Sequence, residues 1–112
     1  MITIDDFKKL EIKIGKILSV EKIPSSDKLL KLSVDMAEES PRQIVSGISS
    51  YFPDEQTLVG KRCAFASNLE SRKLMGLESQ GMILAVSGGE GDSKFFSLLE
   101  TNESVTPGSM VK

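Results

Sequence analysis

Positive charge is concentrated in two blocks of this 112-residue chain, and such blocks can bind phosphate groups. Residues 8–31 hold seven Lys against three acidic residues, and residues 61–73 hold four basic residues against one acid. Residues 32–60 and 74–112 are acidic, which leaves a formal net charge of −2. If the fold brings the basic blocks together, one face can bind phosphates while the whole chain stays acidic. Charge counts alone favour a simpler alternative, in which both blocks are solvated strand edges.

The second basic block continues into a segment of mixed chemistry, NLESRKLMGLESQGMILA at 68–85. It opens with Asn68 and contains the basic pair Arg72 and Lys73, followed by a polar run, a turn at Gly81 and an apolar end. The pattern predicts a polar loop that leads directly into a buried strand. So many uncharged polar groups beside a buried strand need either a binding function or a structural reason.

Composition excludes several kinds of catalytic site. The chain has no His, so His-dependent triads, general bases and metal sites are absent. Cys63 is the only Cys, so there is neither an intramolecular disulfide nor a Cys cluster for zinc. Its place in the strand-like run KRCAFA predicts a buried side chain. No nucleophile is paired with a base, and we expect no catalysis, no cofactor and no metal ion.

The chain length fits one domain, residues 1–112. No stretch approaches the ~20 apolar residues of a membrane span. The start, MITIDDFKKLEIK, has acids where a signal peptide would have a basic end. We therefore expect a cytoplasmic protein without a membrane partner.

Alternating apolar residues predict a chain built mainly of strands. A short helix is expected at 3–10, where Thr3 can cap the first turn. A long strand is expected at 11–23, and Gly15, which interrupts its alternation, predicts a bulge or sharp bend. The strand predicted at 29–36 places four apolar residues on one face: Leu30, Leu32, Val34 and Met36.

Further strands are predicted at 42–48, 62–67, 81–88 and 95–100, with a final extended segment at 105–112. Residues 49–61 are expected to form a connection with one helical turn, and residues 88–94 a hairpin loop. Strands that recur at roughly ten-residue spacing predict a small all-β barrel or sandwich.

Six segments carry a resemblance to a known family: DDFKKLEIKIGKI, SSDKLLKLSVD, RQIVSGI, LVGK, NLESRKLMGLESQGMILA and VTPGSMV. They follow one another along nearly the whole chain, which in this order resembles the tRNA-binding domain family. That family includes the C-terminal domain or β subunit of methionyl-tRNA synthetases and free-standing tRNA-binding proteins. The resemblance implies an OB-fold, a five-stranded barrel with extra C-terminal strands.

The resemblance also implies a set of RNA-facing residues: Lys28, Lys31, Ser46, Asn68, Lys73, Ser79, Gln80 and Met82. Lysines would contact phosphates, uncharged polar groups would contact ribose hydroxyls and base edges, and Met82 would offer a polarizable surface to a base. The implied function is a non-catalytic tRNA-binding and dimerising module. Its implied partners are tRNA, a second copy of the chain and a methionyl-tRNA synthetase catalytic chain.

Dimerisation is expected through the C-terminal segment, whose apolar residues exceed what a five-stranded barrel needs. These residues are Phe95, Leu98, Val105, Met110 and Val111. The aromatic residues are too sparse for base stacking to be the main source of affinity. We therefore expect RNA binding that is weak, sensitive to salt and led by shape.

Each proposed contact has a structural alternative. Asn68 can form a turn by bonding its own backbone, Ser79 and Gln80 can shape the turn before the next strand, and both lysines can be solvated surface charges. For Met82 a core position is the favoured alternative. At the level of function, one alternative is a protein-interaction module that tethers synthetases, and another is a chaperone-like binder of peptides. Met75, where the family often has Arg, weakens the case for tight tRNA binding.

Overall fold

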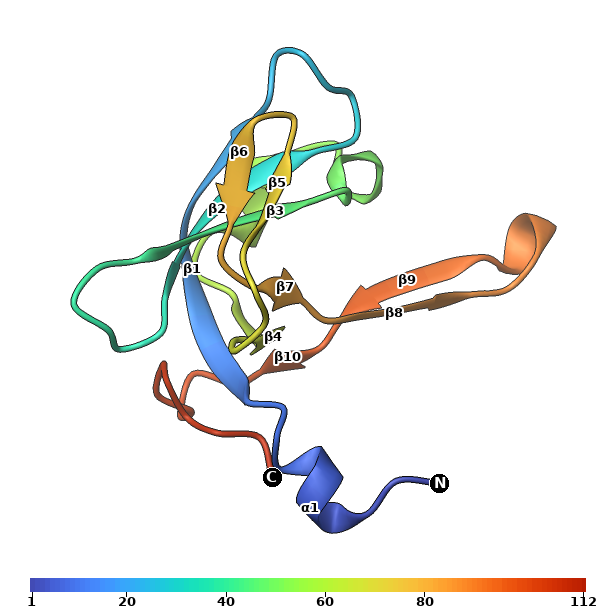
Figure 1. Ribbon diagram of the computed structural model, residues 1–112. Helices are drawn as coiled ribbons and strands as arrows, with labels where there is room; N and C mark the ends of the chain where they lie inside the picture. Colours follow the sequence, from blue (N-terminus) through green and yellow to red (C-terminus); the bar gives the residue numbers. More distant parts are fainter.

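Strands make up nearly all the regular structure of the computed structural model, which describes residues 1–112 (Figure 1). In chain order the elements are α1 (Ile4–Phe7), β1 (Ile12–Lys22), β2 (Leu30–Asp35), β3 (Arg42–Ser46), η1 (Ser49–Tyr51), η2 (Glu55–Leu58), β4 (Arg62–Ala66), β5 (Arg72–Leu74), β6 (Leu77–Ser79), β7 (Met82–Ile83), β8 (Ala85–Gly88), η3 (Gly91–Ser93), β9 (Phe95–Leu98) and β10 (Glu100–Thr101). The predicted all-β class with a short N-terminal helix is confirmed.

The main sheet is antiparallel and runs in the order β10-β4-β1-β2-β3, with β7 also paired to β4. The predicted apolar face of β2 is confirmed, because Leu30, Leu32, Val34 and Met36 are all buried in one core cluster. On β4, Cys63 and Phe65 are also buried in this cluster, as expected. Burial raises the pKa of the Cys63 thiol to about 12, so the thiol is an inert core side chain at neutral pH.

The bend of β1 is not where the sequence predicts it. The register against β2 shifts between Ile17 and Ser19, so the bulge lies at Leu18, whose side chain is exposed. Gly15 faces the core instead, because a Cβ at this position would lie 2.5 Å from Cγ1 of Val34. The glycine is therefore needed for close packing of β1 against β2. Close packing explains the interrupted apolar alternation at Gly15, and the bulge at Leu18 is a separate feature.

The two ends of the main sheet meet without a continuous backbone ladder. β3 forms the last strand at one end, and β7, paired to β4, lies at the other. Between them, the backbone N–H of Gln80 donates to the carbonyl of Gln43 (2.8 Å), and the remaining bonds involve side chains. The expected barrel is thus a curved sheet whose edges are bridged largely by polar side chains.

Several predicted segments are subdivided in the structure. Residues 81–88, expected as one strand, form β7 in the main sheet and β8 in a separate hairpin with β9. The connection at 49–61 contains two 3₁₀ turns, η1 and η2. The final segment at 105–112 runs beside β1: Met110 forms a bridge with Lys13, and backbone hydrogen bonds join Gly108 and Ser109 to Ile14 and Val111 to Ile12. No helix of the structure is long and apolar enough to cross a membrane.

Two small hairpins project from the main sheet. The β5–β6 hairpin, which the sequence reasoning missed, turns at Met75 and Gly76, and both residues have positive φ (52° and 80°). Positive φ at both central residues is typical of a type I′ turn, but Met-Gly lacks the Asn or Asp that usually signals it. The β8–β9 hairpin extends away from the sheet as an arm in Figure 1.

We predict that Gly15→Ala lowers the free energy of unfolding by about 2 kcal/mol, because its Cβ would overlap Val34 and the Phe65 ring. The measurement is urea unfolding followed by circular dichroism. Gly47→Ala is the matched control, since its Cβ would meet only one backbone oxygen, at 4.0 Å. Equal stabilities of the two variants would contradict the packing role of Gly15.

Candidate functional site

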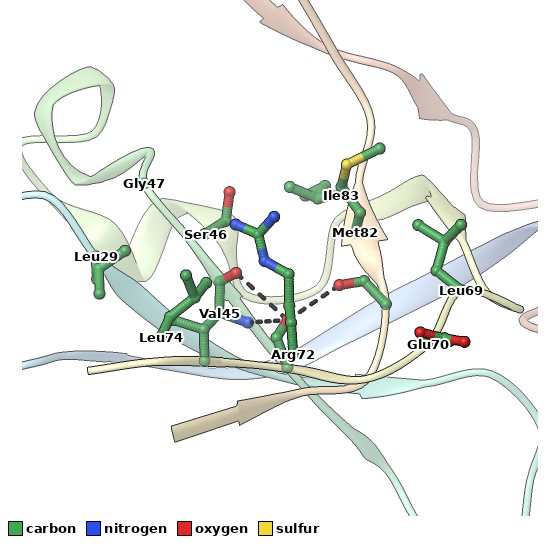
Figure 2. A pocket seen from close by; sticks show the side chains of 12 residues that line it. Leu29, Val45, Ser46, Gly47, Leu69, Glu70, Arg72, Leu74, Met82 and Ile83 are labelled. Atoms are coloured by element: carbon green, nitrogen blue, oxygen red, sulfur yellow. Dashed lines mark hydrogen bonds between the residues drawn. The ribbon is translucent and has the colours of Figure 1, made fainter. Parts of the chain in front are cut away.

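A cleft of about 420 Å³ opens between the β5–β6 hairpin and the end of β3 (Figure 2). Its lining includes Leu29, Ser46, Arg72, Leu74, Met82 and Ile83. The lining thus combines apolar side chains with a hydroxyl and a guanidinium. It draws on segments far apart in sequence, which the curved sheet brings to one place.

Arg72 is the principal charged group of this cleft, and the sequence reasoning did not select it as a site residue. Its side chain is exposed and has neither an ion pair nor a hydrogen bond in the structure. Figure 2 shows it extending from β5 across the cleft toward Ser46. Glu70 also lines the cleft, but no ion pair joins it to Arg72. Because alternate strand residues share a face, Leu74 lies on the cleft side with Arg72 and Lys73 lies on the other.

The structure brings Ser46 and Met82 into the cleft, as the predicted RNA-facing set requires. Met82 is 48% exposed, so the core position favoured from sequence is wrong. The reason is that β7 is only two residues long: Ile83 enters the core cluster, and its neighbour Met82 points the other way.

Lys28 lies beside the cleft. Its carbonyl accepts a hydrogen bond from Ser49 (3.0 Å) and lies 4.0 Å from where a Cβ on the cleft residue Gly47 would be. Lys28 and Lys73 are both exposed and have no ion pair, so both cations are free to contact an anion.

Lys31 is not brought to the cleft. Its ammonium forms an ion pair with Glu21 (3.1 Å), and the residue lines a separate shallow pocket with Glu21, Ser33 and Arg42. The carboxylate already compensates the positive charge that was expected to contact phosphate. Lys31 is therefore the weakest phosphate contact of the predicted set.

Asn68 uses its side chain to hold the N-terminal segment. Its Oδ1 accepts from the backbone N–H of Glu11 (2.8 Å), and its Nδ2 donates to the carbonyl of Lys9 (2.7 Å). Asn68 therefore has a structural role, as the alternative from sequence allowed. However, its side chain bonds a distant segment and not its own turn.

Ser79 and Gln80 are committed to closing the sheet. The Ser79 hydroxyl is buried and accepts from the backbone N–H of Val45 (3.0 Å), a bond drawn in Figure 2. The Gln80 Oε1 accepts from the N–H of Gln43 (2.9 Å). Two side chains therefore occupy the edge of β3 where a neighbouring strand would otherwise bond, and Ser79 also lines the cleft.

Arg42 completes this closure and was missed from sequence. Its guanidinium makes two bonds of 2.7 Å to the carboxylate of Glu38, and its Nη1 donates to the carbonyls of Ser67 and Gln80. The hydrogen bonds from Arg42 hold the pKa of Glu38 below its usual value, and partial burial opposes this shift. The same pair raises the pKa of Arg42, so the ion pair is intact at neutral pH.

Comparisons with known proteins identify the family to which the chain is similar. Residues 12–110 match the family described as "Putative tRNA binding domain". The chain is 46% identical over 99% of its length to the methionine–tRNA ligase of Methanocella arvoryzae, and 50% identical over 100% to that of Methanoregula boonei. It spans only 15% and 16% of the length of these two ligases.

Solved structures extend the likeness to the whole fold. The MetRS related protein from Pyrococcus horikoshii superposes with a TM-score of 0.86 at 36% identity, with 100% of this chain and 98% of that chain covered. The CsaA chaperone protein from Picrophilus torridus superposes with a TM-score of 0.81 at 25% identity, and 100% of each chain is covered.

We predict that the Arg42–Glu38 pair contributes a pH-dependent part of the stability. The pKa of Glu38 is lower in the folded protein, so this contribution is full above the unfolded value, about 4.3, and is lost as the pH falls through the folded value. At pH 7, Glu38→Gln should cost about 1 kcal/mol, because the pair is partly exposed. Arg42→Met should cost about 2–3 kcal/mol, because two carbonyls lose their donor.

Urea unfolding at pH 7 and pH 3 is the measurement, with Glu39→Gln, an exposed acid without an ion pair, as the control. The difference between Glu38→Gln and the parent should shrink at pH 3. A difference that is the same at both pH values would show that the carboxylate charge is not what stabilises the closure.

Proposed function

We propose that this chain, which belongs to the tRNA-binding domain family, binds tRNA at the cleft beneath its β5–β6 hairpin and serves a methionyl-tRNA synthetase. Family membership supports tRNA as the ligand, because the match covers residues 12–110. The family is a binding module without catalytic machinery, which supports the expectation that the isolated chain is not an enzyme. Service to a synthetase rests on identity to the methionine–tRNA ligases.

The observation that carries the proposal is the unpaired guanidinium of Arg72 over the cleft. A guanidinium without a protein partner can bind a phosphate in a bidentate manner without breaking an existing ion pair. Apolar neighbours such as Leu29 and Met82 offer surfaces for a ribose or a base face, and the Ser46 hydroxyl can bond a 2′-hydroxyl.

Lys28 beside the cleft and Lys73 on the outer face of the hairpin add two free cations around Arg72. These groups contact the backbone and not base edges, so binding should depend on the shape of the tRNA more than on its sequence. A chaperone-like peptide binder is the second candidate, which the likeness to the CsaA chaperone protein favours. Peptide binding in an apolar cleft would change little with salt, whereas phosphate binding falls steeply with it.

We predict that Arg72→Gln weakens binding of different tRNAs to a similar extent. One phosphate contact fewer releases one counterion fewer, so the slope of log affinity against log salt should fall by roughly one unit. Lys28→Gln and Lys73→Gln should act in the same direction, and Lys31→Gln least, because Lys31 is already paired. The measurement is fluorescence anisotropy with labelled tRNA at several salt concentrations.

Lys9→Gln is the control, since it removes one exposed charge just after α1, at the opposite end of the molecule from the β5–β6 hairpin in Figure 1, and Lys9 does not line the groove formed by Met110 and Val111. Asn68→Ala is unsuitable as a binding test, because loss of the bonds to Glu11 and Lys9 would also loosen the fold. If Arg72→Gln and Lys9→Gln bind alike at every salt concentration, the cleft is not the tRNA site.

We further propose a homodimer formed through the C-terminal segment. Leu98, counted from sequence among the residues that need cover, is only 5% exposed and belongs to the core of its own chain. Met110 and Val111 remain exposed, and with Ile4 and Leu10 of the N-terminal segment they line an apolar groove of about 350 Å³. A second copy seated there would cover apolar side chains from both ends of the chain.

We predict that the parent sediments at about twice the 12.2 kDa chain mass at tens of micromolar, and that Met110→Asp combined with Val111→Asp yields a monomer with an unchanged circular dichroism spectrum. Sedimentation equilibrium is the measurement. Val86→Asp, on the exposed face of the β8–β9 arm, is the control and should leave the dimer intact. This interface would be contradicted if the parent protein sedimented as a monomer. It would also be contradicted if Val86→Asp dissociated the dimer and the double variant did not.

A further inference from the structure

We propose that the β8–β9 arm carries a second RNA contact, at which unpaired bases stack on Tyr51 and Phe95 while Lys94 binds the adjoining phosphate. This inference rests on the proposed tRNA binding and adds a class of contact that the cleft lacks. Tyr51 belongs to η1 and Phe95 to β9, and Lys94 directly precedes β9; none of them is among the predicted RNA-facing set.

The fold brings most of the few aromatic side chains together where η1 meets β9. The Tyr51 ring stacks on Phe96 with a centroid distance of 3.9 Å and an interplanar angle of 5°, and Phe52 meets Phe96 edge to face at 5.9 Å. Phe95 follows directly in the chain, so four of the six aromatic residues lie at this one place. Base stacking thus becomes available as a local contribution, although the total number of aromatic residues is small.

Two of these rings are exposed although each is supported from behind. Tyr51 is 51% exposed and is held by the parallel ring of Phe96. Phe95 is 56% exposed, and its ring lies over Gly88, where a Cβ would be 2.8 Å from Cζ. A ring fixed on one side and open on the other loses little side-chain freedom when a base stacks on it.

The surroundings of these rings favour an anionic ligand. Tyr51, Lys94 and Phe95 line a shallow hollow of about 440 Å³ that has no carboxylate in its lining. Lys94 is exposed and forms no ion pair. The acids of the arm tip, Glu90 and Asp92, lie outside this lining. An aromatic face beside a free cation suits a nucleotide better than an apolar peptide.

Short stretches of chain connect the residues that line the hollow to residues that line the cleft. Ser46 lines the cleft and Tyr51 lines the hollow, so at most about 17 Å separate their Cα atoms. Ile83 lines the cleft and Ser87 the hollow, which gives a second connection of similar length. One RNA strand held by Arg72 can therefore continue along η1 to the arm.

The protein itself supplies a reporter for this contact. Tyr51 is the only Tyr and the chain has no Trp, so intrinsic fluorescence reports this site alone. Tyr51→Trp keeps an aromatic ring and can be excited where RNA absorbs little. On titration with tRNA, and with a single-stranded RNA oligonucleotide, its emission should be quenched with the same midpoint as fluorescence anisotropy. Unchanged emission at saturating tRNA would overturn the proposal.

The variants that remove the rings are Tyr51→Leu and Phe95→Leu, with Tyr51→Phe as the matched control that keeps the ring. Each Leu variant should weaken binding of the oligonucleotide about tenfold, whereas the control should bind like the parent. Lys94→Gln should reduce the salt slope by roughly one unit. Binding of a blunt-ended RNA duplex should not change in the Leu variants, because stacking requires an unpaired base.

The outcomes separate this proposal from the tRNA-binding cleft. If Arg72→Gln weakens tRNA binding and the Leu variants do not, the cleft stands and the second contact is wrong. If the Leu variants change the sedimentation of the protein but not its RNA affinity, the arm is a subunit interface and the second contact is again wrong. If the Leu variants weaken oligonucleotide binding while Arg72→Gln has no effect, the arm is the RNA site and the cleft is not.

Discussion

The guanidinium of Arg42 joins β3 to β4 and β7, with which β3 shares no backbone ladder. It bonds Glu38 in the loop before its own strand, the Ser67 carbonyl at the end of β4 and the Gln80 carbonyl before β7. A planar group with five donors can satisfy several acceptors at once, which a lysine ammonium cannot do with the same geometry. The rest of the structure depends on this bridge, because it fixes the distance between the two ends of the sheet.

Closure by polar side chains has a direct effect on the cleft. Ser79 and Gln80 bond the free edge of β3, and they belong to the same short stretch that carries the β5–β6 hairpin on one side and Met82 on the other. The groups that close the sheet therefore also position Arg72 above Ser46. Buried hydrogen bonds of this kind are directional, so they specify one geometry where apolar contact alone would permit several.

The parts of the fold that follow local patterns were predictable from sequence. The alternation of β2, the cap at Thr3 and the burial of Cys63 follow from the local sequence, and each is confirmed. The bend in β1 was misplaced because a glycine needed for close packing against Val34 looks the same in sequence as a glycine at a bulge. The cleft itself was not predicted: the resemblance implied a set of eight RNA-facing residues, of which Ser46, Ser79 and Met82 line the cleft.

The site residues show the same limit. Asn68 and Gln80 have polar side chains in a segment that resembles an RNA-facing loop, but each bonds backbone far away in the chain. Nothing in the local sequence distinguishes a group that bonds solvent or ligand from one that bonds a distant carbonyl. Arg42 and Arg72 show the same limit for a charged residue, because the side chain of Arg42 has several hydrogen-bond partners and that of Arg72 has none.

The β5–β6 hairpin is attached to the sheet mainly at its base. Its type I′ turn at Met75 and Gly76 is exposed, and the bonds that fix it come from Glu78, Ser79 and Gln80 at its C-terminal end. Substitutions at outward-facing positions such as Lys73 and Met75 therefore leave the core undisturbed. Natural selection can therefore adjust the charge and shape of this hairpin while the scaffold stays constant.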